Sequence, residues 1–257
     1  MTIPGLRAST GLRVISGLSG AILVAQAVVI AVIIGRLPTP VILPVAINSP
    51  GGAGTIVLGR LDLGVAVIVL CAFVGLARLA VVLPAIFPRY SSGVHANRHS
   101  ARWIEFAFSS SIIIFLVSQL NGISDIGTLV LGYAITGGMT LFTVVQERAA
   151  ASTKDRMLPL WFGAAIGIVP WGVIAFSELA ALLSEYPPSA LVRVITLTML
   201  AFSFAFFLSH WREQRQAHLT QTLTGAERRH ILLSLASTSV FAWLVALGTV
   251  GVGNIRL

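Results

Sequence analysis

One carboxylate, Glu105, stands inside a stretch of the sequence that is otherwise mostly apolar, and Arg78 and Arg102 are the cations that could reach it. An unpaired carboxylate in a low-dielectric environment either takes up a proton or binds a cation, because a buried lone charge is costly. We therefore predict that Glu105 is held by an arginine, first Arg78 and second Arg102. In the alternative, Arg78 extends along its stem to the cytoplasmic surface and Glu105 is protonated.

Other residue types that carry chemistry lack the spacing that catalysis or metal binding requires. The histidines fall in or beside predicted loops without paired ligands on one helix face, so we expect no metal site: His95, His99, His210, His218 and His230. Residues 109–111 are serines with no acid or base partner in view. The run 51–54 lacks the Lys-Ser/Thr of a phosphate loop and reads as a turn. We expect no enzymatic activity.

The composition places these residues in an all-α membrane protein. The chain is 56% hydrophobic and 10% charged, whereas ordinary soluble domains carry about 25% charged residues. The excess apolar surface must face lipid. The net charge of +8 would suggest a nucleic-acid partner for a soluble protein, but basic loops orient a membrane protein, so we expect no nucleic acid. Cys71 is the one cysteine, which excludes a disulfide framework.

Seven apolar segments are each long enough to cross a bilayer, and only helices satisfy their own backbone there. The segments are Val14–Gly35, Leu63–Phe87, Arg102–Leu120, Ile126–Val145, Leu158–Leu183, Ala190–His210 and His230–Val252. The first is too long for the apolar part of a signal peptide, so we expect a retained helix. Pro170 should kink the fifth. We predict one seven-helix domain over residues 1–257.

The basic residues of the loops predict the orientation of the bundle. With the N-terminus inside, thirteen basic residues fall on the cytoplasmic side: Arg7, Arg13, Arg78, Arg89, Arg98, Arg102, Arg148, Lys154, Arg156, Arg212, Arg215, Arg228 and Arg229. Four fall outside: Arg36, Arg60, Arg193 and Arg256. Because cytoplasmic loops carry the excess of Lys and Arg, we predict a cytoplasmic N-terminus and an extracellular C-terminus. This topology is inverted relative to most seven-helix receptors and light-driven pumps.

The first loop, residues 36–62, predicts an extracellular β-hairpin. Two apolar β-prone stretches, Val41–Ile47 and Thr55–Leu58, flank the dense turn signal of residues 48–54. An apolar strand edge outside the membrane needs a cover, so we expect this loop to help form a homodimer. At the other side, Thr224 and Glu227 have capping-box spacing and predict the start of the seventh helix.

Three stretches of sequence carry a family resemblance. Residues 101–111 read Ala-Arg-Trp-Ile-Glu-Phe-Ala-Phe-Ser-Ser-Ser and continue into Asn-Gly-Ile-Ser-Asp-Ile at 121–126; residues 167–171 read Gly-Ile-Val-Pro-Trp; and residues 233–243 read Leu-Ser-Leu-Ala-Ser-Thr-Ser-Val-Phe-Ala-Trp. With the seven spans, inverted topology and long first loop, they resemble the heliorhodopsins over essentially the whole chain. The resemblance implies a rhodopsin-like bundle associated with light sensing and signalling rather than ion pumping.

The resemblance also implies where the site lies, and where this chain departs from the family. Family members hold retinal as a Schiff base on a lysine of the seventh helix, with a glutamate of the third helix as counterion. The glutamate corresponds to Glu105 and the lysine to Thr238. A hydroxyl cannot form a stable imine, and the only lysine, Lys154, lies in a polar loop. We therefore expect no covalent retinal. Family histidines near the Schiff base correspond to Leu23 and Arg78.

Helix arithmetic predicts that Arg78, Glu105 and Thr238 share one layer, roughly 12–16 Å along their helices from the cytoplasmic ends. Residues expected to line the pocket are Ser109, Met139, Trp171, Phe202, Phe206 and Ser237. The phenylalanines at 202, 204, 206 and 207 favour bundle packing over a cofactor cage, and could fill the space that retinal occupies in relatives.

Three functions remain open from the sequence. The favoured one is a multi-pass cell-membrane protein without a covalent chromophore, acting as a sensory receptor or regulatory scaffold whose cytoplasmic loops dock a protein partner. The second is a sensor that binds retinal, another carotenoid product or a lipid non-covalently. The third, a transporter or channel, is disfavoured because ionisable groups within the predicted spans are few and form no chain across the bilayer.

Overall fold

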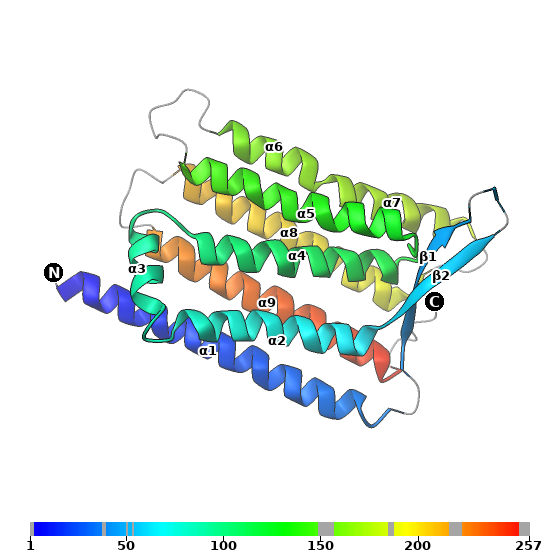
Figure 1. The fold of residues 1–257 in the computed structure, drawn as a ribbon, viewed down its shortest axis with the longest axis horizontal. Helices are drawn as coiled ribbons and strands as arrows, with labels where there is room; N and C mark the ends of the chain where they lie inside the picture. Colours follow the sequence, from blue (N-terminus) through cyan, green and yellow to red (C-terminus); the bar gives the residue numbers. More distant parts are fainter. Residues whose placement is uncertain are drawn as a thin grey trace.

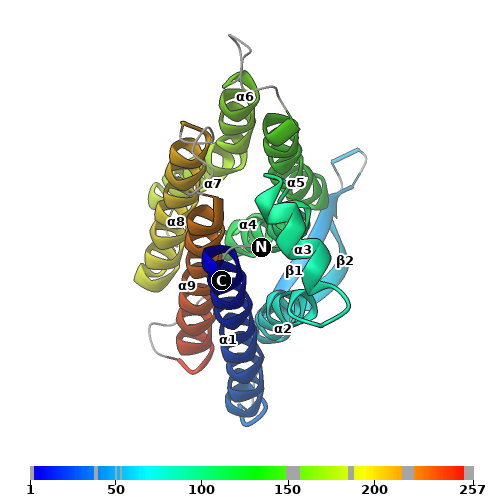
Figure 2. The same ribbon diagram turned by 90° about the vertical axis from the view of Figure 1, so that its left-hand side faces the viewer.

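The apolar segments form a bundle of long helices lying side by side in the computed structural model (Figure 1). It describes residues 3–37, 40–49, 51–52, 54–148, 157–184, 188–215 and 223–251. The long helices are α1 (Ile3–Ile34), α2 (Leu63–Val81), α4 (Ser100–Leu120), α5 (Ile126–Arg148), α6 (Leu158–Gly167), α7 (Val169–Leu182), α8 (Ala190–Arg215) and α9 (Leu223–Thr249). A short helix, α3 (Phe87–His95), covers one end of the bundle (Figure 2).

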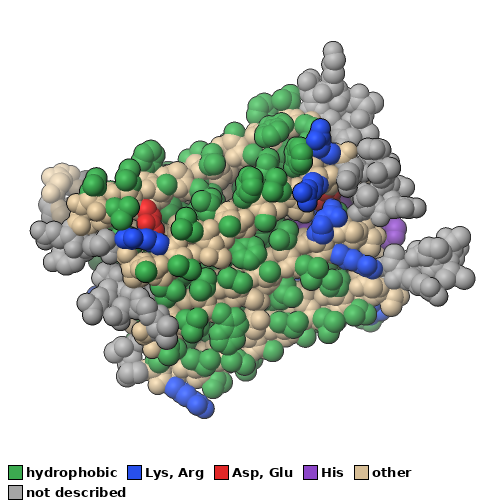
Figure 3. All heavy atoms as spheres, turned by 180° about the vertical axis from the view of Figure 1, so that it is seen from behind, with side chains coloured by type: hydrophobic (Ala, Val, Ile, Leu, Met, Phe, Trp, Pro, Cys, Tyr) green, Lys and Arg blue, Asp and Glu red, His purple; other side chains and the backbone are tan. Residues whose placement is uncertain are grey.

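Seven spans in the described part of the chain are long and apolar enough to cross a membrane, which confirms the predicted number. Their outward faces carry large apolar side chains, such as Leu18, Phe176 and Leu197, that are more than half exposed. Figure 3 shows this apolar surface along the length of the bundle, with several Lys and Arg side chains near one end. These faces are suited to contact with lipid.

The fifth span is broken in the middle, as Pro170 predicts. α6 ends at Gly167, Ile168 forms a turn, and α7 begins at Val169 with Pro170 in its first turn. Proline has no backbone N–H and is tolerated at the start of a helix, not in its interior. The amide of Gly172 bonds to the carbonyl of Ile168 at 2.9 Å, so the second half resumes at once.

The predicted hairpin is present and consists of β1 (Ile42–Asn48) and β2 (Thr55–Asp62), paired antiparallel. Its turn uses Gly51 and Gly52 at positive φ, a conformation that glycine adopts readily. The amide of Ala46 donates to Ser124 O at 2.8 Å, and Gln119 Nε2 donates to Pro44 O at 3.3 Å. The hairpin is thus attached to the segment that joins α4 to α5.

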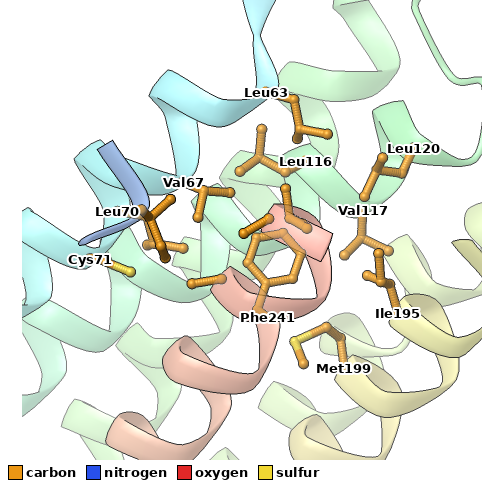
Figure 4. Close-up of a cluster of buried hydrophobic side chains, with 14 of the residues drawn as sticks. Leu63, Val67, Leu70, Cys71, Leu116, Val117, Leu120, Ile195, Met199 and Phe241 are labelled. Carbon is orange, nitrogen blue, oxygen red and sulfur yellow. The ribbon is translucent and has the colours of Figure 1, made fainter. Parts of the chain in front are cut away.

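The apolar core occupies the half of the bundle that is nearer the hairpin. Its buried members come from α1, β1, α2, α4, α7, α8 and α9 and surround Phe241, which is fully buried (Figure 4). Cys71 is part of this core, in agreement with its position in an apolar run. The half that carries α3 is packed differently, because its interior contains charged residues.

Several helix ends at the α3 side differ from the predicted ones. α8 continues past His210 to Arg215, whereas α9 begins at Leu223, next to the start that Thr224 and Glu227 predict and seven residues before the apolar segment. His210 and His230 therefore lie within α8 and α9, His99 directly precedes α4, and all three side chains are buried. Glu227 bonds to other helices, as described below. Residues 149–156, which include Lys154, and His218 lie outside the described residues.

Candidate functional site

The structure brings Arg78 and Glu105 together as a buried ion pair. Arg78 Nη2 of α2 lies 2.6 Å from Glu105 Oε2 of α4, and both side chains are buried. The other carboxylate oxygen, Oε1, accepts from Ser109 Oγ at 3.2 Å and from Ser234 Oγ at 3.3 Å. Hydrogen bonds between ionised partners are shorter and stronger than neutral ones. The structure thus contains the Arg78–Glu105 pair, and the Arg78 side chain does not extend to the surface.

The depth of this pair differs from the prediction of a common layer with Thr238. α2 ends at Val81, so Arg78 lies in its last turn rather than well inside it. Thr238 lies about 6 Å along α9 beyond the residue of that helix that reaches Glu105. The residue of α9 that contacts Glu105 is Ser234, one turn before Thr238.

Arg102, the second candidate partner of Glu105, instead centres a separate buried network. Its Nη2 lies 3.0 Å from Glu213 of α8 and 3.3 Å from Glu147 of α5, and its Nη1 lies 3.2 Å from Glu227 of α9. All four side chains are buried. The guanidinium also stacks over the ring of Trp103 at 4.2 Å. One arginine therefore joins α4, α5, α8 and α9 at the end of the bundle.

Two further residues complete the Arg102 network. His99 Nδ1 lies 2.7 Å from Glu147 Oε1, and Tyr90 Oη of α3 donates to Glu227 Oε1 at 2.7 Å. Burial, followed by the negative charge of Glu227, raises the pKa of Tyr90, so the phenol stays a donor. His99, Glu147 and Glu213 offer atoms within 4.8 Å of one another, a spacing that a metal ion could use. Arg102 Nη2 bridges the two carboxylates, so we assign the cluster to ion pairing.

A cavity of about 370 Å³ lies between α4, α5, α6, α7, α8 and α9. All six residues predicted to line it do so: Ser109, Met139, Trp171, Phe202, Phe206 and Ser237. Phe204 and Phe207 also lie on its wall. The four phenylalanines therefore line the space without filling it.

Thr238 lies on the wall of this cavity and is buried. It presents a hydroxyl where the family resemblance places an amine. Ser109 and Ser234, which hold Glu105, lie on the same wall. Leu23, at a family histidine position, is instead part of the apolar core. The cavity and the Arg78–Glu105 pair are thus adjacent, with serines between them.

The wall formed by α6, α7 and α8 is thin on its outer side. Trp161, Ile168 and Phe204 line the cavity, yet 52%, 66% and 60% of their surfaces are exposed. Since exposed apolar surface on these helices faces lipid, single side chains separate the cavity from the membrane at these positions. An apolar molecule dissolved in the bilayer therefore has a short route to the cavity.

The α3 end of the cavity contains a cluster that the sequence did not predict. His210 of α8 and His230 of α9 stack with ring centroids 5.7 Å apart and planes at 22°. Trp103, Phe106 and Phe206 surround them, with Trp103 4.8 Å from His210 and Phe106 5.3 Å from His230. The only signal in the sequence was the position of each histidine at the edge of an apolar segment.

Comparison with known proteins agrees with this architecture. A family model described as Heliorhodopsin matches residues 12–250, nearly the whole chain. No curated protein matches the chain. The family is one of light-sensing, rhodopsin-like membrane proteins and is not a known class of enzyme. Seven apolar spans and the extent of the match lead to one conclusion: the chain belongs to the heliorhodopsin family.

Proposed function

We propose that this chain is a membrane receptor that binds an apolar ligand, retinal or a molecule of similar size and shape, without a covalent bond. The observation that carries the proposal is the cavity of about 370 Å³ beside Thr238. Ligand pockets are commonly about 300–1,000 Å³ and mostly apolar. A scaffold that had lost its ligand would have no reason to keep such a space, because unfilled cavities destabilise a protein.

Glu105 supports the non-covalent reading. A protonated Schiff base would supply the cation for this carboxylate, but Thr238 cannot form one. Arg78 supplies the positive charge instead, at 2.6 Å. The carboxylate is therefore neutralised without any chromophore, and the cavity does not depend on a bound imine for its electrostatic balance.

The arrangement of helices supports a receptor role. Ser109 and Ser234 contact both the cavity and Glu105, so a ligand there touches the side chains that hold the ion pair. α4, α5, α8 and α9 each contribute to the cavity and also to the Arg102 network at the α3 end. A change in the cavity can in this way reach the surface that would dock a cytoplasmic protein.

We orient this end toward the cytoplasm, with the N-terminus inside and the C-terminus outside. The support is the excess of basic residues in the loops on that side. A single cysteine placed in a tag at either terminus tests the orientation. An impermeant thiol reagent added to intact cells should label the C-terminal tag only, and labelling of the N-terminal tag alone would reverse the assignment.

Two neighbouring alanines of α6 test the ligand proposal. Ala164 lines the cavity, whereas Ala165 is exposed on the outer face. Each variant, Ala164→Trp or Ala165→Trp, is purified from cells supplied with retinal, and bound molecules are measured by visible spectrum and mass spectrometry. We expect the wild-type and Ala165→Trp proteins to retain an apolar molecule and Ala164→Trp to lose most of it. Equal retention by both variants, or none by the wild type, contradicts the proposal.

A further inference from the structure

The α3 end of the cavity has polar atoms that no described residue satisfies. His210 lines the cavity, and its Nε2 is buried without a hydrogen-bond partner. Both ring nitrogens of His230 and Nε1 of Trp103 are likewise buried and without partners in the described part of the chain. Buried polar groups are nearly always hydrogen-bonded, so several orphans side by side need an explanation. Of these three residues only His210 lines the cavity, and a ligand group that binds its ring would satisfy that side chain.

From this cluster we infer that the cavity takes an elongated apolar ligand whose neutral hydroxyl or carbonyl head hydrogen-bonds His210 at the α3 end. The inference rests on the proposed non-covalent function and adds to it the class and direction of the ligand. The lining residues of α8 run from Met199 to His210, about 16 Å along the helix, so the cavity suits a long molecule. Its head would lie some distance from Thr238, where a covalent ligand would be attached.

His210 can serve either kind of neutral head. A neutral imidazole has one donor and one acceptor nitrogen, so it binds a hydroxyl or a carbonyl. Rotation about χ2, whose profile is broad and roughly two-fold, exchanges the nitrogen and carbon edges of the ring. A nitrogen can therefore turn toward the cavity while the ring keeps its stacking on His230.

The charges around the cavity argue against a carboxylate head. None of its lining residues is Lys or Arg. The two nearby guanidiniums are already engaged, Arg78 by Glu105 and Arg102 by three glutamates. A carboxylate buried without a cation is strongly unfavourable. The cavity should therefore discriminate an alcohol or aldehyde from the acid with the same carbon skeleton.

Three retinoid probes that differ only in the head test this inference: all-trans-retinol, its methyl-terminated hydrocarbon analogue, and retinoic acid. Binding to the full chain in lipid nanodiscs is followed by quenching of tryptophan emission, since Trp161 and Trp171 line the cavity. We expect retinol to bind about threefold to tenfold more tightly than the hydrocarbon, the range that one net hydrogen bond provides. Retinoic acid should bind more weakly than retinol.

Variants assign the effect to His210. His210→Phe should abolish the preference for retinol over the hydrocarbon, while His210→Gln should keep part of it. His95→Phe, at an exposed position on α3, is the matched control and should behave as wild type. The ratio of the retinol affinity to the hydrocarbon affinity is compared between proteins, because this comparison cancels the different partition of the two probes into the membrane.

The outcomes separate this inference from the function on which it rests. If wild-type protein binds retinol and hydrocarbon equally, or His210→Phe keeps the preference, the polar subsite is wrong while the apolar cavity stands. If no probe binds the wild type, both are wrong. Should His210→Phe fail to fold, the comparison of the three probes on the wild-type protein still decides.

Discussion

Arg78 Nη2 and Glu105 Oε2 lie 2.6 Å apart in the interior of the bundle, and this pair joins α2 to α4. Two serines share the second carboxylate oxygen. A Schiff-base cation faces the corresponding glutamate in the relatives this chain resembles, and we propose that the Arg78 guanidinium takes that role here.

The first prediction follows from breaking this pair. Arg78→Leu leaves a buried carboxylate without its cation, and should lower the free energy of unfolding in detergent by about 3–5 kcal/mol. Adding Glu105→Gln should recover part of that loss, because the remaining partner is then neutral. Arg89→Leu, at an exposed position, is the control. Simple additivity of the two changes would show that Arg78 and Glu105 are not coupled.

The Arg102 network gives a second prediction. Arg102→Met leaves three buried glutamates facing one another, and should also cost about 3–5 kcal/mol of unfolding free energy. Combining it with Glu213→Gln and Glu227→Gln should restore much of the stability. Arg98→Met, four residues away and exposed, should change it by less than about 0.5 kcal/mol. An Arg102→Met protein as stable as the Arg98→Met control would refute the network as a structural tie.

Asp125 should make the stability of the folded protein depend on pH. Its Oδ2 accepts from the Thr128 amide at 2.7 Å and from Thr128 Oγ1 at 2.9 Å, and these bonds lower the pKa of the carboxyl group. A lowered pKa in the folded state adds stability above the unfolded-state pKa, and this contribution is lost as pH falls through the folded-state value. We expect Asp125→Asn to lower the thermal midpoint at neutral pH. The difference in thermal midpoint between the variant and the wild type should disappear in acid. A difference that does not depend on pH would exclude the charge of Asp125 as its cause.

The hairpin predicts a homodimer. Ile56 and Leu58 of β2 are 49% and 57% exposed, and we propose that a second copy of the chain covers them. Crosslinking in native membranes should yield a dimer that weakens in the Ile56→Ser, Leu58→Ser double variant. Leu183→Ser, at the end of α7, should leave the dimer intact. A monomer in both mild detergent and nanodiscs would count against this interface.

The sequence was sufficient for the spans, the hairpin and six residues of the cavity wall, because each depends on local pattern or on the family motifs. Pro170 predicted the break at Ile168 for the same reason. The pairing of Arg78 with Glu105 was also accessible, since few charges stand near the apolar segments and each needs a partner.

The Arg102 network could not be predicted from the sequence in the same way. Glu147, Glu213 and Glu227 lie at the ends of three different helices, where a glutamate ordinarily faces solvent. Apolar segments end near such charges, so the predicted sixth span stopped at His210, and His210 and His230 were placed in or beside loops. Within the described chain the charges are instead satisfied by one another, which allows the helices to continue. Only the packing of four helices around Arg102 reveals this.

The most direct test of the central claim is the intact mass of the protein after incubation with all-trans-retinal and borohydride reduction. Wild-type protein and Thr238→Lys are compared side by side, with retinal content measured by solvent extraction. We predict retained, extractable retinal and an unchanged mass for the wild type, and a mass increased by one retinyl group for Thr238→Lys. A retinyl adduct on the wild-type protein, or no retinal retained by either protein, would contradict this prediction.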